Sequence, residues 1–63
     1  MTVQITPTTK IETAYDSELG YWTATVHEFD GVCYIPIFED AEGDTEAEAI
    51  QDAKAFITLM ELA

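Results

Sequence analysis

Hydrophobic and polar residues alternate along two segments in the first half of the chain, residues 8–15 and residues 21–27. A period of two is typical of β-strands that have one buried and one solvated face. The second segment is rich in threonine, valine and aromatic residues, and one of its faces would carry Trp22, Ala24 and Val26. Residues 1–7 either extend the first strand or form a frayed arm, because Pro7 suits the start of a strand better than its interior.

A third strand is predicted over residues 32–38, after the turn-forming pair Asp30-Gly31. Pro36 cannot donate a ladder hydrogen bond, so this strand should lie at a sheet edge or carry a bulge. Alternation puts Cys33, Ile35 and Ile37 on one face and Val32, Tyr34 and Phe38 on the other. Residues 16–20 are polar and end in glycine, which indicates a hairpin loop between the first two strands. Residues 39–44 are acidic and contain glycine, which indicates a loop.

The last part of the chain predicts a helix over residues 46–62. Thr45 and Glu48 have the spacing of a capping box, in which the threonine caps the first turn and the glutamate reaches back to a free amide. At 100° per residue, one apolar stripe forms along the helix. Its members are Ala49, Ile50, Ala53, Phe56, Ile57 and Met60.

These elements predict one α+β domain over residues 1–63, a three-stranded antiparallel sheet with one C-terminal helix packed on one face (β-β-β-α). The helix stripe is expected to cover Trp22, Ala24, Val26, Cys33, Ile35 and Ile37. The other face would then display Tyr21, Thr23, Thr25, Tyr34 and Phe38. Apolar patches of this kind often mark interfaces, so we expect a partner or a second copy to bury it, with solvent exposure as the alternative.

Size and charge narrow the class of partner. A chain of 63 residues has a small core, and its single cysteine cannot form an internal disulfide, so a homodimer or higher oligomer is expected. Thirteen acids and two lysines give a formal charge of −11, which repels nucleic acid and anionic membranes. No signal peptide or membrane span is expected, and the protein is predicted to be cytoplasmic.

The sequence offers no group of residues suited to catalysis or metal binding. His27 and Glu28 are adjacent on a strand and point to opposite faces, so His27 is expected to be a surface histidine. Cys33 is predicted to lie inward as a small core residue. The acids of residues 39–44 do not follow the EF-hand pattern, because position six is Asp44 and position twelve is Ile50. We therefore predict a protein that is not an enzyme and uses no cofactor.

Two stretches resemble the HicB-like antitoxin family. Residues 20–31 (GYWTATVHEFDG) are similar to the family's second strand and turn, and residues 43–49 (GDTEAEA), with Ala53 and Ile57, are similar to its loop and capped helix. The similarity extends over roughly residues 8–59. It implies a dimeric scaffold that binds and blocks a small basic ribonuclease toxin.

The expected function is therefore that of an acidic, non-catalytic module that binds a basic protein. The partner would be steered by four acids, Glu39, Asp40, Glu42 and Asp44, while Tyr21, Tyr34 and Phe38 would supply buried contact. Two alternatives remain open from the sequence. The chain would either mimic nucleic acid as the inhibitor of a nuclease from a mobile element, or be a toxinless homo-oligomer whose acidity reflects a salty cell.

Overall fold

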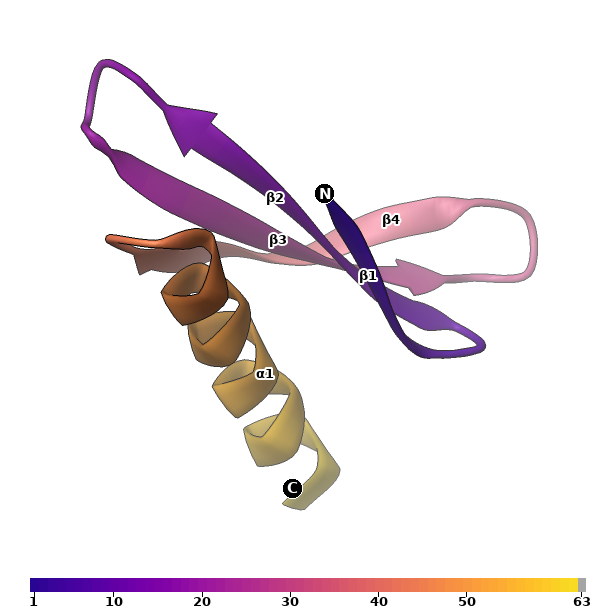
Figure 1. Ribbon diagram of the computed structural model, residues 1–63. Helices are drawn as coiled ribbons and strands as arrows, with labels where there is room; N and C mark the ends of the chain where they lie inside the picture. The colour runs from indigo at the N-terminus through magenta and orange to yellow at the C-terminus, as the bar shows by residue number, and fades with distance from the viewer. Residues whose placement is uncertain (63) are drawn as a thin grey trace.

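The computed structural model describes the backbone of residues 1–62 and the side chains of residues 1–61. The chain forms one four-stranded antiparallel sheet in the order β1-β2-β3-β4, followed by one helix that lies against one face of the sheet (Figure 1). The strands are β1 (Thr2–Thr6), β2 (Thr9–Asp16), β3 (Tyr21–Phe29) and β4 (Tyr34–Gly43), and the helix is α1 (Glu46–Leu62). The predicted α+β class, the antiparallel sheet and the C-terminal helix are confirmed.

The prediction of three strands is wrong, because the first residues form β1. Val3 pairs with Ile11 of β2, and the amide of Thr13 donates to the carbonyl oxygen of Met1 at 2.9 Å. Val3 and Ile5 both pack against the hydrophobic core. This burial, together with the pairing to β2, holds residues 2–6 in the sheet rather than in a frayed arm.

The end of β4 also differs from the prediction. Residues 39–43 were expected to form an acidic loop, but they continue the strand as far as Gly43. Ala41 pairs with Ala24 of β3 and is buried, while Glu42 pairs with Thr23 on the opposite face. The acids on either side of Ala41 point away from the core, so the strand buries its alanine without burying a charge.

A bulge in β4 changes which of its side chains face α1. Val26 pairs with Phe38 and His27 pairs with Pro36, which leaves Ile37 as an extra residue in β4. Ile37 and Phe38 both pack against the core, and the Phe38 ring stacks on Phe56 of α1 at 4.1 Å between centroids. Phe38 was predicted on the open face, and that prediction is wrong. Pro36 lies on an edge strand beside this bulge, as expected.

Cys33 and Ile35 were predicted to lie in the core under the helix, and the structure of the loop between β3 and β4 shows that this prediction is wrong. The Asp30 carboxylate accepts hydrogen bonds from the amides of Val32 and Cys33, both at 2.9 Å, and these bonds hold the pKa of Asp30 below its ordinary value. Cys33 therefore sits in an exposed loop, and Ile35 is 42% exposed. Neither residue contributes to the core. The other predicted hairpin loop, between β2 and β3, is confirmed, and its last residue Gly20 has a φ of 78°.

The core between the sheet and α1 is small and rich in alanine. Its fully buried residues are Ile11, Ala24, Val26, Ala41, Ala49 and Ala53. Alanine on both sides of the interface allows the helix backbone to approach the sheet closely. The predicted helix stripe is confirmed except at Met60, which remains 47% exposed. Within the described residues, α1 is neither long enough nor apolar enough to span a membrane.

Candidate functional site: an acidic hollow at one end of the sheet

Four of the five residues that were predicted to lie on the open face of the sheet, all but Phe38, do lie on the face that α1 leaves open. Tyr21, Thr23 and Thr25 alternate along β3, and Tyr34 pairs with Phe29 at the other end of the same strand. All four side chains are half-buried rather than fully exposed. The two ends of this face have different chemistry, because their neighbours on β1, β2 and β4 differ.

At the Phe29 end, the Tyr34 ring is already covered by residues of the chain itself. The Lys10 ammonium lies 4.3 Å from its centroid, and the Phe29 ring lies 5.3 Å from it. The Gln4 side-chain amide donates to the Tyr34 hydroxyl at 3.3 Å. Lys10 also pairs with Glu12 at 3.0 Å, and this hydrogen-bonded ion pair lowers the pKa of Glu12. The Lys10 ammonium and the Tyr34 ring therefore already make contacts within the protein.

At the Tyr21 end, the start of β3, the end of β4 and the first turn of α1 border an open hollow of about 240 Å³. We call this the acidic hollow. Its lining consists of Tyr21, Glu42, Gly43, Asp44 and Glu48. Three of these five residues are carboxylates, and one is aromatic. The hollow thus combines negative charge with a ring at a concave surface.

Further carboxylates lie around this hollow. Asp16 pairs with Tyr21 across the β2–β3 hairpin, and the Asp52 carboxylate accepts a hydrogen bond from the Glu42 amide at 3.1 Å. Partial burial raises the pKa of Tyr21, and the negative charges of Glu42 and Asp16 raise it further. Lys10, the lysine of the sheet, lies six residues from Asp16 along β2, about 20 Å away. The lysine of the sheet is therefore far from the hollow.

The helix start fixes one wall of the hollow. The Glu48 amide donates to the Thr45 hydroxyl, and the Asp44 amide donates to the Glu48 carboxylate, each at 3.2 Å. The predicted cap by Thr45 is therefore confirmed, while Glu48 reaches back to the amide of Asp44 rather than to that of Thr45. Gly43 has to be glycine, because an added Cβ would lie 2.5 Å from the amide nitrogen of Ala49. The strand and the helix meet at Gly43 closely enough to bring Glu42 and Glu48 to one surface.

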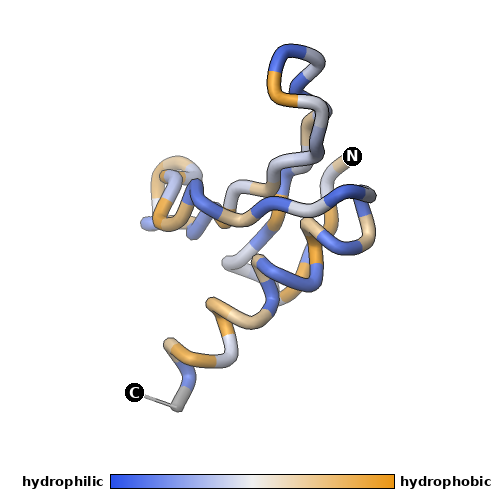
Figure 2. The backbone as a smooth tube through the Cα atoms, turned by 90° about the vertical axis from the view of Figure 1, so that its left-hand side faces the viewer, coloured by the Kyte–Doolittle hydropathy of each residue, from blue (hydrophilic) through white to orange (hydrophobic). Residues whose placement is uncertain are grey.

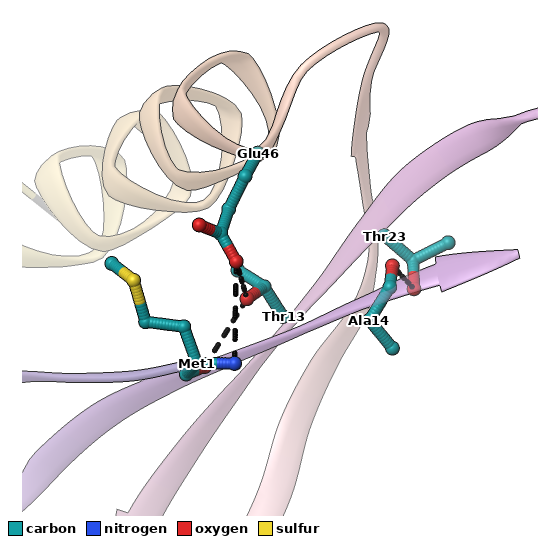
Figure 3. A network of polar contacts seen from close by, with 5 residues as sticks. All are labelled: Met1, Thr13, Ala14, Thr23 and Glu46. Carbon is teal, nitrogen blue, oxygen red and sulfur yellow. Dashed lines mark hydrogen bonds and ion pairs between the residues drawn. The ribbon is translucent and has the colours of Figure 1, made fainter.

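Glu46, the other acid in the first turn, has a structural role (Figure 3). The Thr13 hydroxyl donates to its carboxylate at 2.7 Å, and the Met1 carbonyl oxygen lies 3.2 Å from the same hydroxyl. The N-terminal ammonium lies 4.0 Å from the same carboxylate. This network links β1 and β2 to the start of α1. Glu46 is therefore directed toward the protein and away from the acidic hollow.

The remaining predicted site residues are distributed as follows. Glu42 lines the acidic hollow, while Glu39 and Asp40 are exposed on β4 where that strand bulges opposite Thr25. Phe38 is on the helix side and does not belong to the site. The sequence prediction of partner-binding residues missed Glu48, whose capping role was recognised but whose position beside Tyr21 depends on how the helix meets the sheet.

The structure allows little other chemistry at this end of the molecule. Across residues 1–62, no group of three histidine, cysteine or acidic side chains has the geometry to hold a metal ion. His27 is half-buried, and its Nδ1 atom is buried without a hydrogen-bond partner. It pairs with Lys10 and Pro36 on the neighbouring strands, six residues along β3 from Tyr21. The carboxylates and the ring of the acidic hollow can attract a positively charged organic group such as an ammonium or a guanidinium.

Comparison with known proteins identifies no family for this chain. No family model matches the chain, and neither a curated protein nor a solved structure matches it.

Proposed function

We propose that this protein is a non-catalytic binding module that takes up a basic partner protein, with the acidic hollow as the point of contact. The observation that carries this proposal is the hollow itself, where Glu42, Asp44 and Glu48 surround Tyr21. Carboxylates and an aromatic ring are the groups that hold arginine or lysine side chains, through charge-assisted hydrogen bonds and cation–π contact.

The volume of the hollow supports a side chain as its occupant. Sites for small organic ligands usually measure about 300–1,000 Å³, and this hollow is below that range at about 240 Å³. Its lining is also mainly polar, whereas small-molecule sites are mostly apolar. One arginine or lysine projecting from a partner would fill it.

Charge outside the hollow favours the same class of partner. The chain carries a formal charge of −11, and the structure places Glu39 and Asp40 on the exposed edge strand that leads to the hollow. A strong negative field of this kind accelerates the encounter with a positively charged protein. The sequence resemblance to HicB-like antitoxins makes a small basic cytoplasmic ribonuclease the first partner to test.

The first test removes one carboxylate from the hollow. Glu42→Gln should slow association with a captured basic partner by roughly 2–10-fold at low salt and flatten the salt dependence of the rate, because a steering charge is lost. The partner would be isolated with tagged wild-type protein, washed at increasing salt and identified by mass spectrometry. Association would then be measured by biolayer interferometry.

Glu18→Gln is the matched control, since it removes one exposed charge from the β2–β3 loop and leaves the hollow intact. Equal effects of the two variants would show that only total charge matters and would contradict a localised site. Capture of acidic or neutral proteins alone would contradict the proposal as a whole. Competition between this protein and duplex DNA or RNA for binding to the captured partner would instead favour nucleic-acid mimicry.

A second measurement tests the electrostatics of the hollow without any partner. The negative charge of Glu42 disfavours the tyrosinate form of Tyr21, so Glu42→Gln should lower the pKa of Tyr21 toward its ordinary value. The titration is followed by NMR of the Tyr21 ring carbon that bears the hydroxyl. An unchanged Tyr21 pKa would show that the two side chains do not interact.

A further inference from the structure

A second concave surface lies on the helix side of the sheet. It is a groove of about 180 Å³ between the last turns of α1 and the sheet. Its lining consists of Thr9, Glu28, Ile37, Ile57, Met60 and Glu61. Both views of the backbone show the C-terminal end of α1 projecting away from the sheet (Figures 1 and 2), and Figure 2 shows hydrophobic positions continuing along it. We call this the wedge groove.

The floor of the wedge groove is apolar and incompletely covered. Ile37 and Ile57 are half-buried, and Met60 is 47% exposed although it belongs to the stripe that packs on the sheet. Ala53, two turns earlier on the same stripe, is fully buried. The core therefore ends before the helix does. The last turns of α1 leave an apolar surface with no residue of the described chain packed over it.

The rim of the groove is acidic on both walls. Glu28 comes from the end of β3 and Glu61 from the last turn of α1, and both are exposed. Lys10 is held by Glu12 and Tyr34 on the opposite face of the sheet, and Lys54 does not line the groove. A second copy of this chain would bring another net charge of −11 against this rim, so repulsion opposes self-association there.

We infer that the wedge groove binds a basic amphipathic helix of a partner protein. One bulky apolar side chain of that helix occupies the space between Ile37, Ile57 and Met60. Lysine or arginine residues three or four positions away, on the same helical face, reach Glu28 on the sheet wall and Glu61 on the helix wall. The volume of the groove suits one such anchor and is too small for a typical organic ligand.

This surface is distinct from the acidic hollow. Glu28 and Tyr21 are seven residues apart on β3, which places the two sites about 23 Å apart at opposite ends of the strand. The acidic hollow has three carboxylates beside a ring, whereas the wedge groove has an apolar floor between two carboxylates. The inference therefore goes beyond the proposed function and does not depend on it.

The test uses a fluorescein-labelled 14-residue peptide with leucine at helical spacing and lysine elsewhere, titrated at physiological salt and followed by fluorescence anisotropy. A scrambled peptide of the same composition has the same charge but no apolar face. We expect the amphipathic peptide to bind and Met60→Lys to weaken its affinity by at least about tenfold, because the anchor site is then filled by a charge. Glu28→Gln with Glu61→Gln should slow association and reduce its salt dependence.

Leu59→Lys is the matched control, since it introduces the same charge change one residue away. Leu59 is 67% exposed and does not line the groove, so this variant should bind like the wild type. Circular dichroism melting of each variant confirms that it is folded. The inference is overturned if the peptide does not bind, if the scrambled peptide binds equally well, or if Leu59→Lys and Met60→Lys weaken binding to the same extent. A wild-type dimer that Met60→Lys dissociates would overturn it too, because a second copy would then fill the groove.

Discussion

Ile11→Ala is expected to leave the protein largely unfolded at 25 °C. Ile11 is 0% exposed and, with Val26, is one of the two largest fully buried side chains in the described structure. Truncating a buried isoleucine to alanine costs about 2–5 kcal/mol, because apolar contact is lost and a cavity remains. The core of a domain this small supplies roughly 3–5 kcal/mol, so this one change removes most of the stability.

Urea denaturation provides the measurement, with Trp22 fluorescence and far-UV circular dichroism as the two probes. Trp22 suits this purpose because it is half-buried and its ring packs edge-on against Tyr15 at 5.6 Å. Ile11→Val is the graded control and should cost about 0.5–1.5 kcal/mol. A stable, cooperatively folded Ile11→Ala protein would mean that Ile11 does not hold β2 to the helix as the structure indicates.

Gly43→Ala is expected to be the most damaging change at the junction between β4 and α1. An added Cβ would lie 2.5 Å from the Ala49 amide nitrogen, 2.6 Å from Glu48 Cβ and 2.8 Å from the Glu48 carbonyl carbon. Two of these atoms belong to the helix backbone, so α1 has to move away from the strand to relieve the contact. Overpacking of this kind typically costs about 1–3 kcal/mol and occasionally more.

The sign of this effect makes the experiment decisive. Where the backbone permits it, glycine to alanine stabilises a protein by about 0.4–1 kcal/mol, because the unfolded chain loses conformational freedom. The φ of Gly43 is not positive, so any loss of stability there comes from the contact with α1. Gly20→Ala is the comparison, since its Cβ would meet nothing within 4 Å and its cost comes from a φ of 78°. A Gly43→Ala protein as stable as the wild type in urea would disprove the close approach.

Gly43→Ala also bears on the proposed site. Moving the start of α1 would separate Glu48 from Glu42 and change the shape of the acidic hollow. We expect Gly43→Ala molecules that remain folded to bind a basic partner more weakly than Gly20→Ala molecules. The close approach at Gly43 thus contributes both to folding and to the arrangement of the charges.

Several features of this fold are determined by residues close together in the sequence. The predicted helix bounds, residues 46–62, agree with α1, because the cap at Thr45 and the 3.6-residue apolar period are properties of the local chain. The hairpin loop before Gly20 is likewise local, since the Asp16 carboxylate accepts bonds from the amides of Glu18 and Leu19. β2 and β3 follow the predicted alternation to within two residues at each end.

The remaining features depended on contacts between distant residues. β1 is a strand because β2 pairs with it, and the acidic end of β4 is a strand because Ala41 packs beside Ala24 in the core. The bulge at Ile37 breaks the period of two, which no alternation rule can anticipate, and it moves Phe38 onto Phe56. The acidic hollow belongs to this group as well. Strand alternation places Tyr21 and Glu42 on the open face, but only the packing of α1 against Gly43 brings Glu48 beside them.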